Sequence, residues 1–147
     1  MRQNLPLMLI RIIVGLVFLV EGILKVMYPA ELGAGRFAHI GLPFPDVLGP
    51  LVAVVEIVAG AAVMLGFYAG DAAILLLAVI ATAIITTKVP ILLGGPLGRF
   101  APPKLHHYGL LAFIHEARTD LSMLFGLVAT LIDQGVRIGR KRKWYQP

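Results

Sequence analysis

The sequence predicts an all-α integral membrane protein, a transmembrane bundle of four helices that run up-down-up-down. Of its 147 residues, 59% are hydrophobic and 14% are charged, well below the roughly 25% of charged residues in soluble domains. The mean hydropathy is +0.88. Apolar stretches close to the roughly 20 residues that a helix needs to cross a bilayer recur along the chain. A water-soluble domain of this size would lack the polar side chains needed to cover its surface.

Four apolar stretches are expected to span the membrane within a single domain, residues 1–136. They cover about 7–27, 47–67, 72–92 and 119–136. The last one is short, and Thr119 and Asp120 stand where a helix N-cap is expected. A cleaved signal peptide is the alternative for the first stretch, but charged residues lie inside it and no Ala-x-Ala site follows.

Three connections separate the spans. Residues 28–46 are rich in proline and glycine and predict a loop, with or without one short helix. Residues 68–71 predict a tight turn, which makes the second and third spans an antiparallel hairpin. The connection over residues 94–118 is long. Its apolar part, Leu105 to Ile114, is too short to cross the membrane and is expected either to lie in the interface or to extend the fourth helix outward.

The net charge of +5 arises in one short segment. The residues that carry it are Arg137, Arg140, Lys141, Arg142 and Lys143. A terminal basic run beside an apolar span sets membrane topology rather than binding nucleic acid, so no nucleic-acid partner is expected. The positive-inside rule makes residues 137–147 a basic cytoplasmic tail. With four spans, both termini are then cytoplasmic and the two long loops lie outside.

Ionisable residues occur inside or beside the predicted spans, where a charge near a helix centre costs at least ~2.5 kcal/mol. They are Arg11, Glu21, Lys25, Glu56, Lys88, Glu116, Arg118, Asp120 and Asp133. We expect them to face the bundle interior and to pair. Glu21 precedes Lys25 by four residues, the favourable order for an ion pair on a helix. Glu56 lies near the middle of its span, on a face where Ala53 and Gly60 are small enough to admit a neighbouring helix.

A simpler interpretation stays open for several of these charges. Lys25, Lys88 and Arg118 would extend to the membrane interface, and Asp120 would be a helix N-cap without further role. This interpretation is weaker for Glu56, because a carboxylate in the middle of a span has no nearby water.

Other chemistries find little support in the sequence. The chain has no cysteine, which excludes disulfides, thiol relays and thiolate-ligated metals. No pair of its histidines has the i, i+4 spacing of a helical metal site, so no metal site is expected. These histidines, all on the predicted outer side, are His39, His106, His107 and His115.

Several stretches together carry a family resemblance. In residues 9–25, Arg11 and a glycine precede a phenylalanine, a polar residue with glycine, and Lys25. This stretch resembles the first helix of the DoxX family. Residues 36–45 and 51–66 are similar to that family's first external loop and second helix, and residues 115–120 are similar to a variant in some members. Glu21 departs from the pattern, since many members carry histidine at this position. If a side chain at this position exchanges protons, the pH range in which it does so differs between glutamate and histidine.

The resemblance implies a four-helix protein of the bacterial inner membrane. Some DoxX-like proteins resemble the small membrane subunit of thiosulfate:quinone oxidoreductase, and others are linked to membrane redox assemblies that handle thiols or oxidative stress. The leading expectation is therefore a membrane subunit of a quinone-linked redox complex. Quinone reduction needs hydrogen-bond donors for two carbonyls, proton carriers and a dry, apolar slot.

Under this hypothesis the site residues fall into two groups. The chemistry is assigned to Arg11, Glu21, Lys25 and Glu56, and quinone binding to Lys88, His115, Glu116, Arg118 and Asp120. No covalently bound cofactor is expected, so a redox partner subunit or a directly reacting substrate supplies the electrons. Self-association is the other contact expected. The alternatives are a non-catalytic scaffold that anchors a partner and, less favoured because no repeat or discontinuous helix is visible, a small-solute or proton transporter.

Overall fold

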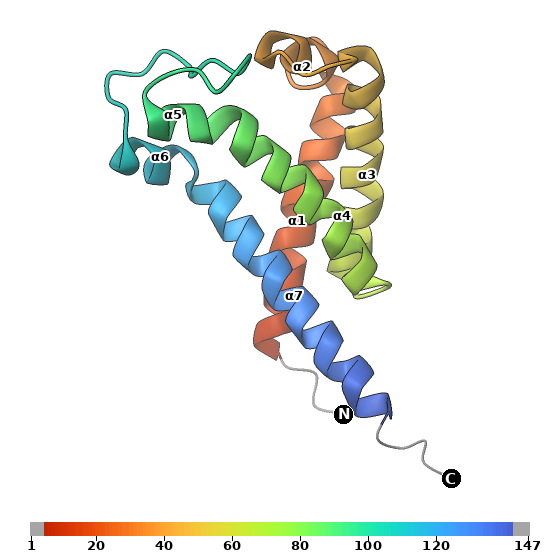
Figure 1. The fold of residues 1–147 in the computed structure, drawn as a ribbon. Helices are drawn as coiled ribbons and strands as arrows, with labels where there is room; N and C mark the ends of the chain where they lie inside the picture. The colour runs from red at the N-terminus through yellow and green to blue at the C-terminus, as the bar shows by residue number, and fades with distance from the viewer. Residues whose placement is uncertain (1–4, 143–147) are drawn as a thin grey trace.

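All regular elements of the part of the chain that the structure describes are helical, as predicted (Figure 1). The computed structural model describes residues 5–142, with side chains described up to residue 135. The elements are α1 (Leu5–Met27), α2 (Ala34–Ile40), α3 (Pro45–Leu65), α4 (Ala69–Ala83), the π-helical segment η1 (Ile84–Lys88), α5 (Val89–Leu93), α6 (Leu110–Glu116) and α7 (Arg118–Arg142).

Three helices in the described residues are long and apolar enough to cross a membrane. They are α1, α3 and the continuous helix Ala69–Leu93, which comprises α4, η1 and α5. Large apolar side chains such as Leu9, Val58 and Ile74 are exposed on them, a distribution that is costly in water and favourable in lipid. The chain is therefore a membrane protein.

The fourth predicted span differs from expectation in length. Helix α7 begins at Arg118 but continues past residue 136 to Arg142, so the first part of the predicted basic tail is helical. Asp120 and Asp133 interrupt its apolar sequence, and α7 is not among the helices that qualify as candidate spans in the described residues.

The turn between α3 and α4 lies earlier than predicted. Gly66 ends α3 with φ 75°, and Tyr68 precedes α4 with φ 47°. Gly66 suits this place because it adopts the left-handed conformation without steric cost. Gly70 and Asp71, expected in the turn, belong to the first turn of α4, where an acidic side chain favours the helix N-terminus.

The two longer connections each contain one short helix. Helix α2 realises the optional short helix in the first. In the second, α6 (Leu110–Glu116) covers only the later part of the apolar stretch that begins at Leu105, and Ala117 (φ −93°, ψ 3°) separates it from α7. The apolar segment therefore does not simply extend α7.

Pro90 explains the π-helical segment in the third candidate span. A proline within a helix lacks the N–H that would bond four residues back and crowds the preceding turn. The helix here widens over Ile84–Lys88, directly before α5, in which Pro90 lies in the first turn. Such widened turns bend helices and occur frequently at functional sites.

Helix α1 packs most extensively against α3, and α4 packs about equally against α7 and α3. We call α1–α3 and α4–α7 the two pairs (Figure 1). The core between the pairs includes Phe18, Val63, Leu76 and Leu127. Small residues let α1 and α3 approach closely: a Cβ added to Gly22 would lie 2.7 Å from the carbonyl oxygen of Ala53. The pairs diverge toward the end of the molecule that carries α2 and α5 (Figure 1).

Candidate functional site

A cavity of about 660 Å³ lies between α1–α3 and α4–η1–α7, with α2 also contributing to its lining. Most of the site residues predicted from the sequence meet there. Those that line the cavity are Glu21, Lys25, Glu56, Lys88, Glu116 and Asp120. The volume falls in the range of pockets that enclose a small organic molecule.

Lys25 bridges two carboxylates on the α1–α3 side of the cavity. Its Nζ lies 2.7 Å from Oε2 of Glu56 and 3.3 Å from Oε2 of Glu21, to which it donates a hydrogen bond. The expected i, i+4 pair is thus confirmed, and α3 adds a second carboxylate. We call Glu21, Lys25 and Glu56 the acidic triad.

The α1–α3 crossing positions this triad. Glu56 follows Ala53 by one helical turn on the face of small residues predicted from the sequence, and the residue is 4% exposed. Because the backbones of α1 and α3 approach closely at Gly22 and Ala53, the long side chain of Lys25 reaches Glu56. The expectation that Glu56 faces the interior and pairs is confirmed.

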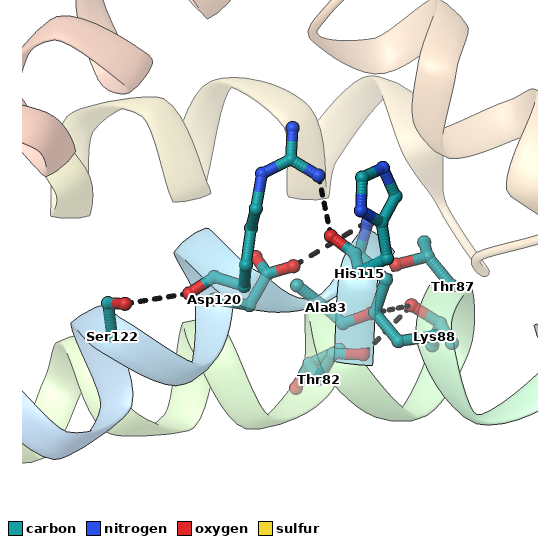
Figure 2. Close-up of polar contacts among 9 residues, drawn as sticks. Thr82, Ala83, Thr87, Lys88, His115, Asp120 and Ser122 are labelled. Atoms are coloured by element: carbon teal, nitrogen blue, oxygen red, sulfur yellow. Dashed lines mark hydrogen bonds and ion pairs between the residues drawn. The ribbon is translucent and has the colours of Figure 1, made fainter. Parts of the chain in front are cut away.

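A second ion pair stands on the α4–α7 side. Nζ of Lys88, from the π-helical segment, lies 3.6 Å from Oδ2 of Asp120 in the first turn of α7 (Figure 2). Both side chains are partly buried. The predicted N-cap position of Thr119 and Asp120 is wrong, because α7 already begins at Arg118 and both residues lie in its first turn. Lys88 contacts a carboxylate rather than extending to the surface unpartnered.

Threonine hydroxyls follow the same helix along the cavity. Thr86 and Thr87, in the π-helical segment, donate hydrogen bonds to the carbonyl oxygens of Thr82 and Ala83, at 2.8 and 2.7 Å. Thr82, Thr86 and Thr87 line the cavity. These hydroxyls satisfy carbonyls of the distorted helix and add polar groups beside Lys88.

Three predicted site residues lie outside the cavity lining. Arg11 is buried at the opposite end of α1, where a Cβ on Gly66 would lie 3.3 Å from its Nη1. His115 and Arg118 are exposed, and Nη1 of Arg118 donates to the carbonyl oxygen of His115 at 2.6 Å (Figure 2). The structure therefore does not bring these residues to the acidic triad.

Sequence reasoning missed the contribution of α2. Arg36 and Phe37 line the cavity from this short helix, although the sequence predicts an external loop for both. The one available signal was a charged residue beside an aromatic one in that loop. Hydrophobic periodicity does not reveal that a loop segment folds back over the bundle.

The cavity combines apolar walls with two ammonium groups. Its apolar lining residues include Phe18, Val52, Ile80 and Met123. The two ammonium groups are those of Lys25 and Lys88, and each contacts at least one carboxylate. Such a site suits a largely apolar molecule with hydrogen-bond acceptors. In the described residues, no group of three or more histidine, aspartate or glutamate side chains is arranged to hold a metal ion.

Comparison with known proteins places these features in one family. The DoxX family model matches residues 6–89. The uncharacterized membrane protein Rv3486 of Mycobacterium tuberculosis is 48% identical over 123 residues, which cover 83% of this chain and 71% of that protein. No solved structure matches the chain. The matched range contains the whole acidic triad and Lys88, whereas Asp120 lies beyond it.

Proposed function

The chain belongs to the DoxX family, and from this premise we propose that it is the membrane subunit of a quinone-linked redox complex. One observation carries the proposal: two lysine ammonium groups, each beside a carboxylate, face an otherwise largely apolar cavity of about 660 Å³. A quinone headgroup presents an apolar ring and two carbonyl oxygens, the features that such walls and such donors bind.

The proposed chemistry is a two-electron reduction. Lys25 and Lys88 donate hydrogen bonds to the two carbonyl oxygens, which draws electron density toward the oxygens and favours reduction. The quinone gains two electrons and two protons and becomes a quinol. The electrons come from a sulfur-containing reductant, a thiol or thiosulfate, which reacts directly or through a partner subunit. The chain's own residues bind, orient and exchange protons.

Binding of a short-chain quinone tests this function. We expect the purified protein in nanodiscs to bind a decyl-substituted benzoquinone saturably, and Lys25→Ala and Lys88→Ala each to raise Kd at least tenfold, because a hydrogen bond from a charged donor contributes about 1.5–3 kcal/mol. Binding is followed by fluorescence quenching or equilibrium dialysis. Lys104→Ala is the control, since Lys104 is exposed in the loop after α5. Equal, non-saturable uptake by all variants would contradict the proposal.

We propose further that α7 completes a four-span up-down-up-down bundle in the bacterial inner membrane, with both termini cytoplasmic. In support, α1, α3, α4 and α7 alternate in direction, and α1 begins at the end of the molecule where α7 finishes (Figure 1). The basic residues at the end of α7 place that end in the cytoplasm.

Cysteine labelling tests this topology, because the natural chain has no cysteine. We expect Ala101→Cys, in the loop between α5 and α6, to react with a membrane-impermeant maleimide applied to spheroplasts. Phe67→Cys, in the turn before α4, should react only after the membrane is opened. The measurement is the fraction of protein labelled, and reversed accessibility would invert the proposed orientation.

A scaffold is the second candidate function. The observation that favours it is that the Lys25–Glu56 contact joins two helices and so also fixes their relative rotation. A scaffold that recruits a partner should retain partner binding when Glu21→Gln and Lys25→Gln are combined, whereas a redox subunit with this site should lose quinone binding.

A further inference from the structure

The acidic triad places one ammonium between two carboxylates of very different exposure. The Glu21 side chain is 49% exposed and lines the cavity, whereas that of Glu56 is 5% exposed within the α1–α3 packing. The Lys25 side chain between them is 11% exposed. One carboxylate is thus accessible from the cavity, and the other is sealed against the helix pair.

The charge of the triad differs from that of the second ion pair. Two carboxylates and one ammonium leave one negative charge in excess, whereas Lys88 and Asp120 balance each other. An uncompensated charge is costly in a poorly solvated interior. The triad can reduce that cost by holding one further proton. The remaining charged groups of the cavity lining are Arg36 on α2 and Glu116 at the end of α6.

We propose that Lys25 delivers a proton to the reduced quinone, that Glu21 reloads Lys25 from water at the cavity, and that Glu56 holds Lys25 in position from within the α1–α3 packing. This assignment rests on the proposed function and divides the roles within the site. The cavity-facing position of Glu21 suits a group that exchanges protons with water, and the buried position of Glu56 suits one that does not.

The proton transfer involves two steps. After the quinone has received two electrons from the sulfur-containing reductant, its oxyanion takes a proton from Nζ of Lys25; an N–H bond breaks, an O–H bond forms, and Lys25 becomes a neutral amine. A proton from water at the cavity then reaches Nζ through the Glu21 carboxylate, which takes it up on the cavity side and passes it on, so that Lys25 regains its charge and Glu21 ends as it began. These steps supply one of the two quinol protons, and the other oxyanion, bound by Lys88, takes the second proton from water at the cavity.

Arginine at position 25 separates proton delivery from charge. Arginine keeps the positive charge and donates hydrogen bonds to carboxylates, but it does not release a proton in proteins. If Lys25 acts only through its charge or its packing, Lys25→Arg should still form quinol at the natural rate. If Lys25 delivers a proton, Lys25→Arg should form quinol more slowly. Glu21→Gln removes the reloading group while it leaves Lys25 beside Glu56.

The experiment uses the full chain in nanodiscs, in excess over decyl-substituted benzoquinone, with dithionite as the chemical reductant. We expect Lys25→Arg to bind the quinone with a Kd within threefold of the natural protein but to form quinol at least tenfold more slowly, in line with the contribution of a positioned general acid. The natural protein should react more slowly in D₂O than in H₂O, and Lys25→Arg should lose this difference. With quinone in excess instead, so that Lys25 has to be reloaded between turnovers, Glu21→Gln should form quinol more slowly than the natural protein after the first turnover, and equal rates would overturn the reloading role.

The outcomes distinguish the two proposals. Equal rates and equal isotope effects for Lys25→Arg and the natural protein would overturn the proton-delivery role while quinone binding stands. Absence of saturable binding by the natural protein would instead overturn the proposed function. Should Lys25→Arg fail to fold, Lys25→Ala with added methylamine replaces it: we expect the amine to restore quinol formation and tetramethylammonium, which carries no N–H, to leave it slow. Equal rescue by both cations would overturn proton delivery.

Discussion

Replacing Glu56 with alanine is expected to lower the free energy of unfolding by about 3–5 kcal/mol, the range found when one partner of a buried ion pair is removed. Lys25 would keep its charge in a site where its side chain is 11% exposed, with one carboxylate 3.3 Å away instead of two. The measurement is denaturant unfolding in detergent micelles, followed by far-ultraviolet circular dichroism.

Two controls separate the buried charge from lost packing. Glu21→Ala removes the other carboxylate of the same lysine from an exposed position, and it should cost about 1 kcal/mol or less. The double variant Lys25→Met/Glu56→Leu removes both charges and should recover most of the stability, because an apolar pair of similar volume often replaces a buried ion pair without loss. If Glu56→Ala were no more destabilising than Glu21→Ala, the burial of the triad would be contradicted.

Local patterns account for what could be predicted about the site. The pairing of Glu21 with Lys25 follows from a spacing of four residues on one helix. The interior position of Glu56 follows from the small residues on its face, since a carboxylate on such a face within an apolar stretch has to lie at a helix–helix contact. Both features depend on periodicity within a single helix, which the sequence shows directly.

Contacts between helices account for most of what the sequence did not show. Which carboxylate on α3 meets Lys25 depends on the rotation and height of α3 relative to α1, and no helical spacing encodes either. The contribution of Arg36 depends on α2 folding over the bundle. Arg11 lies on the same face of α1 as Lys25, but it lies near the other end of the helix, beside Gly66. Two residues on one helical face therefore need not belong to one site.

The widened helix before Pro90 was within reach of sequence reasoning. A proline inside an apolar stretch predicts a local distortion one turn earlier, and that turn carries Lys88. The distortion shifts the residues after it by part of a turn relative to a regular helix. The side chain that meets Asp120 therefore depends on the proline as well as on the lysine.

Replacing Gly60 with leucine is expected to be strongly destabilising at the α1–α3 crossing. Even a Cβ at this position would lie 2.8 Å from the backbone nitrogen of Leu19 and 2.9 Å from the carbonyl oxygen of Gly15, and backbone atoms cannot move aside as a flexible side chain does. The helices have to separate, so we expect a loss of about 3 kcal/mol, the upper part of the range for overpacking. Since Gly60 follows Glu56 by one turn on the same face, the separation should also lengthen the contact between Glu56 and Lys25 and weaken quinone binding. Denaturant unfolding and quinone titration measure the two effects.

Gly135 provides the matched control for this prediction. It is also a helical glycine, but no heavy atom outside its own helix backbone and chain neighbours lies within 4 Å of a Cβ added there. Gly135→Leu should therefore leave stability unchanged or raise it by about 0.5–1 kcal/mol, because leucine favours a helix more than glycine does. A loss of stability at Gly60 without a loss at Gly135 would assign the effect at Gly60 to the helix crossing. Similar losses at both would instead point to a general intolerance of larger side chains in these helices, and the close approach of α1 and α3 would no longer explain how Lys25 reaches Glu56.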